Sequence, residues 1–285
     1  MSARDVVLVS ARALHDELAA RTGDLVLLDV RWALGVTDGH EQHLAGHLPG
    51  AVFVDLETEL AAPPSPARGR HPLPDVADLQ AAARRWGVRA GSRVVAYDAV
   101  GATSAARAWW LLRWAGLEDV RLLDGGLGAW TDEGFAVETG DVVPVPGDVL
   151  LSQGELPTLT PDDAAHLASS GSGLLLDARA GERFRGEVEP VDPRAGHVPG
   201  AVSAPTTGNL GPGGRFLDEA ALRDRFAGLG LGDGTHGRVG VYCGSGVTAA
   251  HEVAALATIG VDAALYAGSW SQWSNDETRP VATGA

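Results

Sequence analysis

The strongest constraint on the fold is that this chain of 285 residues contains much of its own pattern twice. The copies keep their order, and the offset between matching segments varies only from 143 to 150 residues, so only the loops differ in length. The matching pairs are VLLDVR from Val26 and LLLDAR from Leu174, AGHLPGAV from Ala45 and AGHVPGAV from Ala195, VVAYDAVGAT from Val94 and VGVYCGSGVT from Val239, and LDGGLGAW from Leu123 and YAGSWSQW from Tyr266. The repeat predicts two homologous domains, residues 1–140 and 158–285, joined by a linker at 141–157.

Each copy alternates short apolar runs with helical patterns. The runs at 24–30, 92–98, 173–178 and 238–243 are rich in Val and Leu, which is typical of buried parallel strands. Helical patterns at 75–87 and 103–116 each close with glycine. This alternation predicts an α/β fold in each domain, with a mainly parallel sheet flanked by helices. The loops at 62–74 and 206–216 are expected to be surface connections.

Composition excludes several classes of partner. The formal net charge of −15 argues against nucleic acid and anionic membranes, although screening within about 8–10 Å leaves room for a local site for a small anion. There is no apolar run of about 18 residues and no leader pattern at the start, so a cytoplasmic protein without a membrane partner is expected. One cysteine and nine scattered histidines predict neither a structural metal nor any other cofactor.

The repeat also separates shared residues from those that one copy alone has. An aspartate, an arginine and a histidine occur at equivalent positions in both copies, which favours structural roles for these residues. The equivalent pairs are Asp29 and Asp177, Arg31 and Arg179, and His47 and His197. The sharp differences lie after the last strand run, where Asp98, Ala99 and Val100 stand opposite Cys243, Gly244 and Ser245. Arg183 stands opposite Gly35. The first domain is therefore predicted to be catalytically silent and the second to be catalytic.

Cys243 is expected to be a nucleophile because of its surroundings. It ends a strand and precedes a helix, the place where parallel α/β folds bind ligands. The loop CGSGVT can turn backbone N–H groups inward, and with the helix N-terminus these favour thiolate over thiol. Thr248 is expected to cap that helix. The alternative is an inert buried cysteine.

These residues carry a resemblance. The tandem domains, the CGSGVT loop, LLLDAR followed by RFRGEVEP, the two AGHxPGAV segments and YAGSWSQW resemble the rhodanese-like sulfurtransferases over almost the whole chain. The resemblance implies that Cys243 accepts a sulfane sulfur as a persulfide from an anionic small donor. It then passes the sulfur to a thiophilic acceptor, either cyanide or a thiol such as that of a thioredoxin-like protein.

The resemblance also implies roles for individual residues. Arg183 is expected to bind the anionic donor, with Asp177 bracing it, and the loop residues Gly244, Gly246, Val247 and Thr248 to contact the substrate. In the mercaptopyruvate branch a second arginine commonly follows Glu-Pro, whereas this chain has Val191 near that place and its next arginine is Arg194. First-domain groups also contribute in that branch, and His47 and Asp38 are the candidates here.

The loop after Cys243 bears on the donor. The loop is neutral and carries Ser245, whereas the thiosulfate enzymes of the family that this chain resembles carry basic side chains there. The resemblance therefore favours 3-mercaptopyruvate over thiosulfate as the donor. Ser245 is expected to donate or relay a proton during C–S cleavage. A phosphatase or arsenate reductase would need an arginine six residues after the cysteine, where this chain has Ala249. A non-catalytic binding module remains the other alternative.

Overall fold

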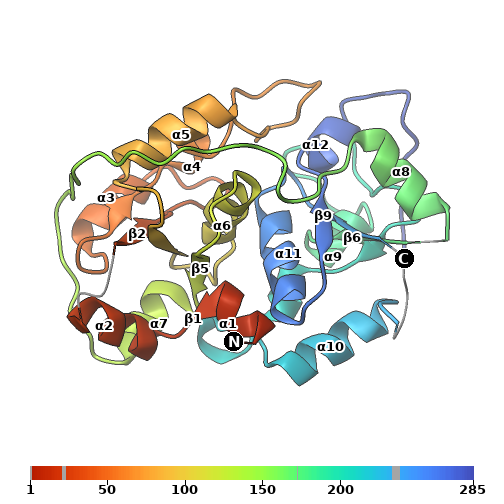
Figure 1. Ribbon diagram of the computed structural model, residues 1–285. Coiled ribbons are helices and arrows are strands. Elements are labelled where there is room, and N and C mark those ends of the chain that lie inside the picture. The colour runs from red at the N-terminus through yellow and green to blue at the C-terminus, as the bar shows by residue number, and fades with distance from the viewer. Residues whose placement is uncertain (1, 21–23, 172, 233–237) are drawn as a thin grey trace. The chain divides into compact units, whose positions relative to one another are not determined.

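The computed structural model describes residues 2–20, 24–171, 173–232 and 238–285. The chain forms two compact units, each built on a parallel sheet (Figure 1). Unit 1 comprises residues 1–62, 74–156 and 210–216, and unit 2 comprises residues 63–73, 157–209 and 217–285. Within the described ranges no helix is long and apolar enough to cross a membrane.

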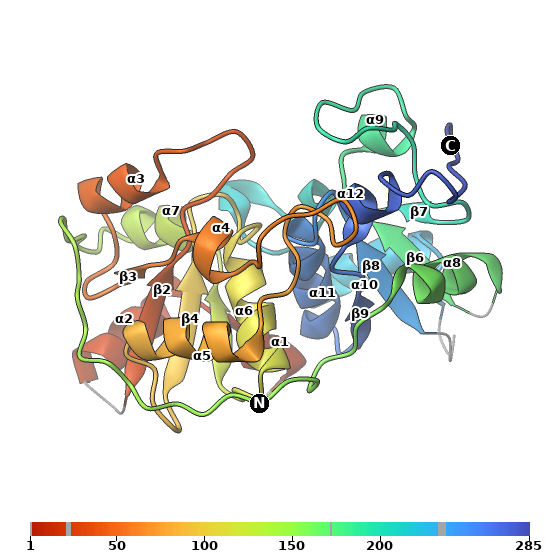
Figure 2. The same ribbon diagram turned by 90° about the horizontal axis from the view of Figure 1, so that it is seen from above.

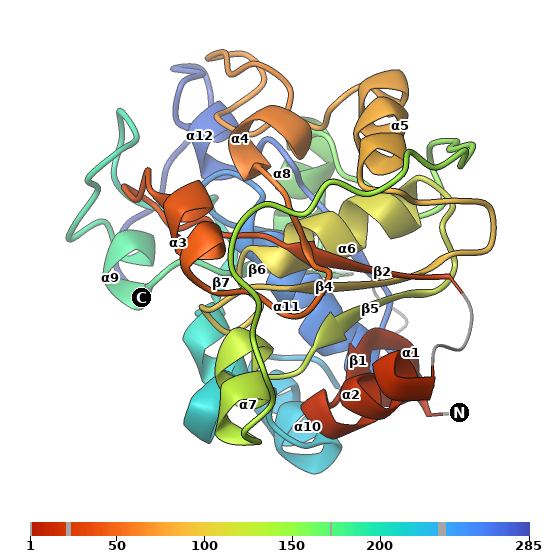
Figure 3. The same cartoon turned by 90° about the vertical axis from the view of Figure 1, so that its left-hand side faces the viewer.

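Unit 1 contains a five-stranded sheet with the order β1-β5-β4-β2-β3, in which every pair is parallel. The two central strands are buried along almost their whole length, as expected for strands covered on both faces. Figure 3 shows α5 and α6 on one side of these strands and α1, α2 and α7 on the other. The strands are β1 (Leu8–Val9), β2 (Leu25–Asp29), β3 (Val52–Phe53), β4 (Arg93–Tyr97) and β5 (Val120–Leu123). The helices are α1 (Ala3–Val7), α2 (Ala11–Ala20), α3 (Gly39–Ala45), α4 (Leu56–Glu59), α5 (Val76–Arg85), α6 (Ala105–Trp114) and α7 (Gly126–Asp132).

Unit 2 repeats this architecture with four strands in the order β7-β6-β8-β9, again all parallel. Helix α11 packs on β8 and β9, and α8 packs on β6 (Figure 2). The strands are β6 (Leu174–Asp177), β7 (Val202–Ser203), β8 (Val239–Tyr242) and β9 (Ala263–Leu265). The helices are α8 (Pro161–Ser169), α9 (Gly181–Phe184), α10 (Glu219–Gly228), α11 (Thr248–Thr258) and α12 (Ser269–Trp273), with the 3₁₀ turn η1 (Thr206–Asn209). A second 3₁₀ turn, η2 (Pro212–Gly214), lies in the segment that packs in unit 1. Trp270 and Trp273 are buried in the core of this unit. The predicted fold class is confirmed.

Two loops depart from the boundaries that the repeat predicted. Residues 63–73 come from the first copy in sequence but pack in unit 2, and residues 210–216 come from the second copy but pack in unit 1. Both loops have exposed residues, as expected of surface connections, at 66–68 and 212–213, but His71 and Phe216 are each only 4% exposed. Each copy therefore supplies a loop to the unit built on the other copy.

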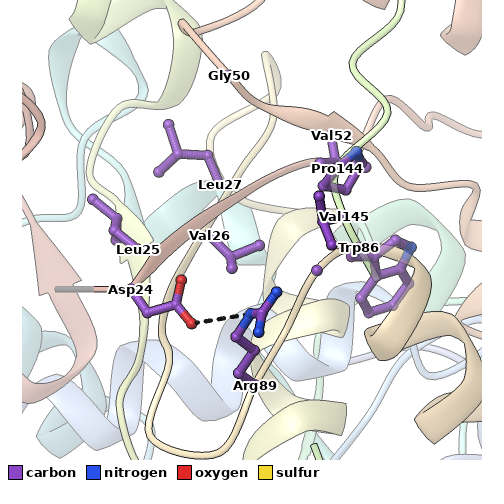
Figure 4. Close-up of a pocket in the computed structure, with 11 residues that line it drawn as sticks. Asp24, Leu25, Val26, Leu27, Gly50, Val52, Trp86, Arg89, Pro144 and Val145 are labelled. Carbon is purple, nitrogen blue, oxygen red and sulfur yellow. Dashed lines mark ion pairs between the residues drawn. The ribbon is translucent and has the colours of Figure 1, made fainter. Parts of the chain in front are cut away.

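The predicted linker begins as an extended segment against unit 1. The N–H groups of Gly147, Ser152 and Glu155 donate to backbone carbonyls of that unit at 2.8–3.1 Å. A cavity of about 250 Å³ lies between this segment and the start of β2 (Figure 4). Its lining includes Asp24 and Arg89, which form an ion pair at 3.7 Å. Because this cavity lies at the amino end of β2, it is not where parallel sheets of this type bind ligands.

Candidate active site

Cys243 lies at the carboxyl end of β8, and α11 begins five residues later. Its Sγ accepts a hydrogen bond from the N–H of Gly246 at 3.1 Å. Its own N–H donates to Ser269 Oγ at 3.1 Å, and its carbonyl accepts from the N–H of Trp270 at 2.9 Å. The residue is 1% exposed, so the thiol lies buried at the base of the loop.

Ser269 is held in an unfavourable conformation to make that contact. Its φ is +54°, in the left-handed region, and the equivalent residue in unit 1 is Gly126, with φ +56°. Non-glycine residues in this region cost roughly 1–3 kcal/mol and concentrate at functional sites. The serine hydroxyl also donates to the carbonyl of Tyr266 at 2.8 Å. Unit 2 therefore tolerates strain where unit 1 uses glycine, and gains a side chain that fixes the backbone of Cys243.

The equivalent loops of the two units differ in what occupies their backbone amides. In unit 1 the buried carboxylate of Asp98 accepts four backbone hydrogen bonds. The donors are the N–H groups of Val100 and Ala102 to Oδ1 and of Ser104 and Ala105 to Oδ2, all at 2.8–2.9 Å. Burial raises the pKa of Asp98, while these N–H groups act in the opposite direction. The carboxylate of Asp98 thus occupies the backbone N–H groups that could otherwise bind an anion.

In unit 2 the loop amides are open. Among the described residues, Sγ of Cys243 accepts a hydrogen bond from the N–H of Gly246 alone. The N–H groups of Gly244, Ser245 and Val247 have no hydrogen-bond partner among the described residues. Gly246 has φ +81°, and a Cβ there would lie 2.4 Å from the carbonyl oxygen of Ala267, so the turn requires glycine. Unpaired amides around a nucleophile can bind an anion or the negative charge that develops on sulfur.

Helix α11 begins without the expected side-chain cap. Thr248 is its first residue, the N-cap is Val247, and no side chain accepts a hydrogen bond there. In unit 1 the hydroxyl of Thr103 donates to the carbonyl of Val100. The expectation that Thr248 caps its helix is therefore wrong, because Thr248 lies one residue past the N-cap. Thr103 lies one residue before Ser104, the N-cap of α6.

Ser245 is paired with a histidine that the sequence analysis did not single out. Nδ1 of His71 lies 2.7 Å from Oγ of Ser245, and both residues are at most 5% exposed. His71 belongs to the loop 63–73, which packs in unit 2. The repeat held a usable signal, because GRH in this loop stands opposite GRF in the other copy, so the histidine occurs in one copy only.

Two arginines flank Gly244. A Cβ at Gly244 would lie 3.0 Å from Nη2 of Arg70 and 3.4 Å from Nη1 of Arg183. Arg183 is held by Glu189, with Nη2–Oε1 at 2.6 Å and Nε–Oε2 at 3.3 Å, and by Asp192 at 3.4 Å. Arg70, also missed in the sequence, donates to Asp192. The position therefore suits glycine, where the other copy has Ala99.

The expectation that Asp177 braces Arg183 is wrong. Asp177 is fully buried and pairs with Arg179, whose Nη2 lies 2.6 Å from Oδ2. Arg179 also donates to the carbonyl of Gly196. Asp29 and Arg31 form the same ion pair in unit 1, where Arg31 donates to the carbonyl of Gly46. In both units, this Asp–Arg ion pair links the end of a strand to the backbone of a later loop. The carboxylate of Asp177 thus pairs with Arg179, which is nearer in sequence than Arg183.

Arg194 does not take the place of the missing second arginine. Its guanidinium donates to four backbone carbonyls, at 2.6–2.9 Å. The acceptors are the carbonyls of Trp273, Ser274, Asp276 and Arg279. Arg194 therefore fastens the segment after α12, and Val191 leaves an uncharged, half-exposed side chain on the loop.

His47 and Asp38 belong to unit 1. Nδ1 of the buried His47 lies 3.0 Å from the carbonyl oxygen of Glu138, and burial lowers the pKa of this histidine. Asp38 precedes α3 and accepts a hydrogen bond from Gln42. His197, the counterpart of His47, makes a similar contact to the carbonyl of Phe184, which fits a structural role for both histidines.

Comparison with known proteins agrees with this architecture. Residues 11–133 and 160–276 match the family described as rhodanese-like domain. The chain is 52% identical over 290 residues to the putative thiosulfate sulfurtransferase SseB of Mycobacterium tuberculosis, covering 100% of this chain and 99% of that protein. It is 50% identical over 277 residues to the probable 3-mercaptopyruvate sulfurtransferase of Pseudomonas aeruginosa, covering 94% and 96%.

Solved structures place the same fold on an enzyme. The crystal structure of SseA from Escherichia coli, described as a 3-mercaptopyruvate sulfotransferase with the rhodanese fold, matches with a TM-score of 0.82 and 32% identity. The match covers 92% of this chain and 98% of that one. Fold and site thus define a duplicated α/β enzyme with one intact nucleophile loop. The chain belongs to the rhodanese-like family, and the predicted class, a tandem-domain sulfurtransferase, is confirmed.

Proposed function

We propose that this sulfurtransferase takes its sulfur from 3-mercaptopyruvate and carries it as a persulfide on Cys243. The observation that supports this donor most directly is the neutral loop with Ser245 hydrogen-bonded to His71. Mercaptopyruvate must gain a proton on carbon as its C–S bond breaks, and a serine–histidine pair beside the nucleophile can move one. The similarity to the Pseudomonas and Escherichia proteins agrees with this choice.

The reaction balances with the groups present. The thiolate of Cys243 attacks the donor sulfur, an S–S bond forms, and the C–S bond breaks with its electron pair on C3. The thiol proton of the donor moves through Ser245 and His71 to that carbon, which gives pyruvate. The open N–H groups of the loop stabilise the negative charge on sulfur, and the two guanidinium groups beside Gly244 hold the donor anion.

The second half-reaction regenerates the enzyme. An acceptor thiolate or cyanide attacks the outer sulfur of the persulfide, and Cys243 leaves as the thiolate. A thioredoxin-like protein is the acceptor we propose for the cell. The cytoplasmic location stays a prediction from the sequence.

Thiosulfate is the second candidate donor. The relative from Mycobacterium tuberculosis carries that name at 52% identity, and the two arginines beside Gly244 could also hold a dianion. Steady-state rates with both donors and cyanide as the common acceptor decide between them. A higher kcat/KM with 3-mercaptopyruvate supports the proposal, and a higher value with thiosulfate overturns the choice of donor.

The covalent intermediate has its own test. Incubation with donor alone, followed by intact-mass spectrometry, should show the gain of one sulfur atom, lost again on addition of cyanide. Cys243→Ser should lose both the adduct and turnover. Turnover that persists in this variant would show that another group is the nucleophile, and absence of the adduct in the wild type would favour a binding module.

A further inference from the structure

The loop at residues 63–73 is held by a serine at the start of α12. Oγ of the buried Ser271 accepts a hydrogen bond from the N–H of Arg70, the residue before His71, at 3.0 Å. The hydroxyl of Ser271 donates its own proton to the carbonyl of Gly268 at 3.0 Å, so its oxygen is left to act as an acceptor. Ser271 therefore fixes the backbone one residue before His71.

The loop is also rigid where it meets this helix. Gly69 has φ +88°, and a Cβ there would lie 2.6 Å from the carbonyl oxygen of Gly268, so the close approach requires glycine. Backbone hydrogen bonds between Ser65 and Gly69, at 2.8 and 3.1 Å, close the loop on itself. The side-chain amide of Gln272 donates to the carbonyl of Ala67 at 2.7 Å. Because the loop is cross-linked and attached to α12 at several points, its last residues have a defined position.

Ser271 bonds to the nucleophile loop as well. Its N–H donates to the carbonyl of Gly244, the residue before Ser245, at 2.8 Å. The same residue thus holds the backbone next to His71 through its side chain and the backbone next to Ser245 through its main chain. These two bonds set the spacing of His71 and Ser245, whose Nδ1 and Oγ lie 2.7 Å apart.

The first copy has no equivalent of this serine. Gly128 stands in α7 where α12 has Ser271, so unit 1 has no hydroxyl at this place. The loop that unit 1 receives, residues 210–216, is attached differently, because Asp124 accepts a hydrogen bond from the N–H of Phe216 at 2.8 Å. The serine therefore occurs only in the copy whose received loop brings a histidine to the nucleophile loop.

We propose that Ser271 is a positioning residue for sulfur transfer, which holds His71 in register with Ser245 so that the pair can move a proton. The inference rests on the proposed function and deepens it, because it assigns the alignment of the proton-transfer pair to a residue outside the nucleophile loop. Without the hydroxyl, the N–H of Arg70 loses its acceptor and the loop can shift away from Ser245. A displacement of about 1 Å between reacting groups can cost about a hundredfold in rate.

The kinetic test uses the two donors and a double variant. Ser271→Ala should lower kcat with 3-mercaptopyruvate about tenfold and leave KM nearly unchanged, since its main-chain bond to Gly244 persists. The rate with thiosulfate should change far less, because its cleavage delivers no proton to carbon. In a His71→Ala background, Ser271→Ala should have little further effect, because the serine acts through the histidine. Gln272→Ala should give a smaller loss with the same dependence on the donor.

Ser274→Ala is the matched control. Ser274 is a buried serine directly after α12, and its hydroxyl has no partner among the described residues. This variant should keep the wild-type kcat with both donors. The kcat of each variant is corrected for its folded fraction from urea unfolding.

A second readout does not depend on turnover. Nitrogen chemical shifts of isotope-labelled histidine report the tautomer and hydrogen bond of an imidazole. The signals of His71 should move in Ser271→Ala toward those of Ser245→Ala, and they should stay unchanged in Ser274→Ala.

Two outcomes would overturn the positioning role. One is unchanged shifts together with an unchanged kcat in Ser271→Ala. The other is an equal loss with both donors that adds to the effect of His71→Ala, because Ser271 would then only support the fold. If the wild type forms no persulfide with either donor, the proposed function fails, and the chemical shifts still decide whether Ser271 positions His71.

Discussion

Nδ1 of His71 lies 2.7 Å from Oγ of Ser245, and this pair joins a loop from the first copy to the loop of the nucleophile. Which atom carries the shared proton depends on the histidine tautomer. When Nε2 carries the proton, Nδ1 accepts a hydrogen bond from the hydroxyl and can act as its base; when Nδ1 carries the proton, the histidine donates to Oγ. The contact turns an ordinary loop serine into a group that can pass a proton.

His71→Ala and Ser245→Ala should each lower kcat with 3-mercaptopyruvate by about a hundredfold, within the usual range for general acid–base groups. The double variant should lose little more than either single variant, because the two act as one unit. Rates with thiosulfate should change far less, since its cleavage delivers no proton to carbon. His166→Ala, on an exposed helix position, is the control. Equal losses with both donors would argue that the pair only supports the loop.

Asp98→Ala should destabilise the protein without touching the chemistry. Four backbone N–H groups lose their buried acceptor, and each such loss costs about 1–3 kcal/mol before water and relaxation offset part of it. We expect a clear drop in the urea midpoint with kcat unchanged after correction for folded fraction. Asp98→Cys in a Cys243→Ser background should stay inactive, because unit 1 has Gly35 and Ala99 where unit 2 has Arg183 and Gly244. Sulfur transfer by that double variant would show that the first copy is a competent site.

Arg183→Ala should lower kcat/KM about tenfold with either donor, since one charge-assisted N–H contact beside Gly244 is lost. The loss also leaves the buried carboxylates of Glu189 and Asp192 with one cation fewer. Arg185→Ala is a close control, because its guanidinium pairs with Glu187 on the exposed side of the same segment. If Arg183→Ala retains the wild-type kcat/KM for both donors, the residue serves only to pair with its carboxylates.

Glu252 on α11 should make stability depend on pH. Burial raises its pKa from 4.5 to about 7, although Arg225 and the hydrogen bond from Asn209 act in the opposite direction. The folded state therefore binds the proton more tightly than the unfolded state, and stability falls as pH rises from about 4.5 to about 7. Above this range the penalty reaches at most about 3 kcal/mol.

Glu252→Gln keeps the shape and removes the titration. It should unfold at a higher temperature than the wild type at pH 8, and the difference should shrink toward zero at pH 5. Glu219→Gln, at an exposed ion pair on α10, should show no such dependence. A pH-independent difference for Glu252→Gln would mean that this carboxyl does not titrate between folded and unfolded states in the expected range.

The sequence was sufficient for the fold because strands and helices follow from local patterns. The apolar runs that end at Asp29 and Asp177 became β2 and β6, and the repeat identified Cys243 as the residue that one copy alone has. Packing partners of loops carry no such periodicity. A loop rich in proline and glycine gave no sign that Arg70 and His71 would lie beside Gly244 and Ser245.

The sequence also could not choose between neighbouring ion pairs. Asp177 lies near both Arg179 and Arg183 along the chain, and the register of the strand end decides in favour of Arg179. The carboxylates that hold Arg183 come from the following loop, from Glu189 and Asp192, to which the sequence analysis assigned no role. Both outcomes follow from tertiary contacts, which a residue pattern does not specify.

Each copy contributes a loop, residues 63–73 or 210–216, to the unit built on the other copy. Neither unit is therefore complete without the other copy. A polypeptide that began at residue 158 would carry the nucleophile but neither His71 nor Arg70. The first copy, which has Asp98 opposite Cys243, therefore supplies residues that the second copy alone would lack. If the first copy has no activity of its own, this short stretch of chain still gives a reason for the two copies to be retained together.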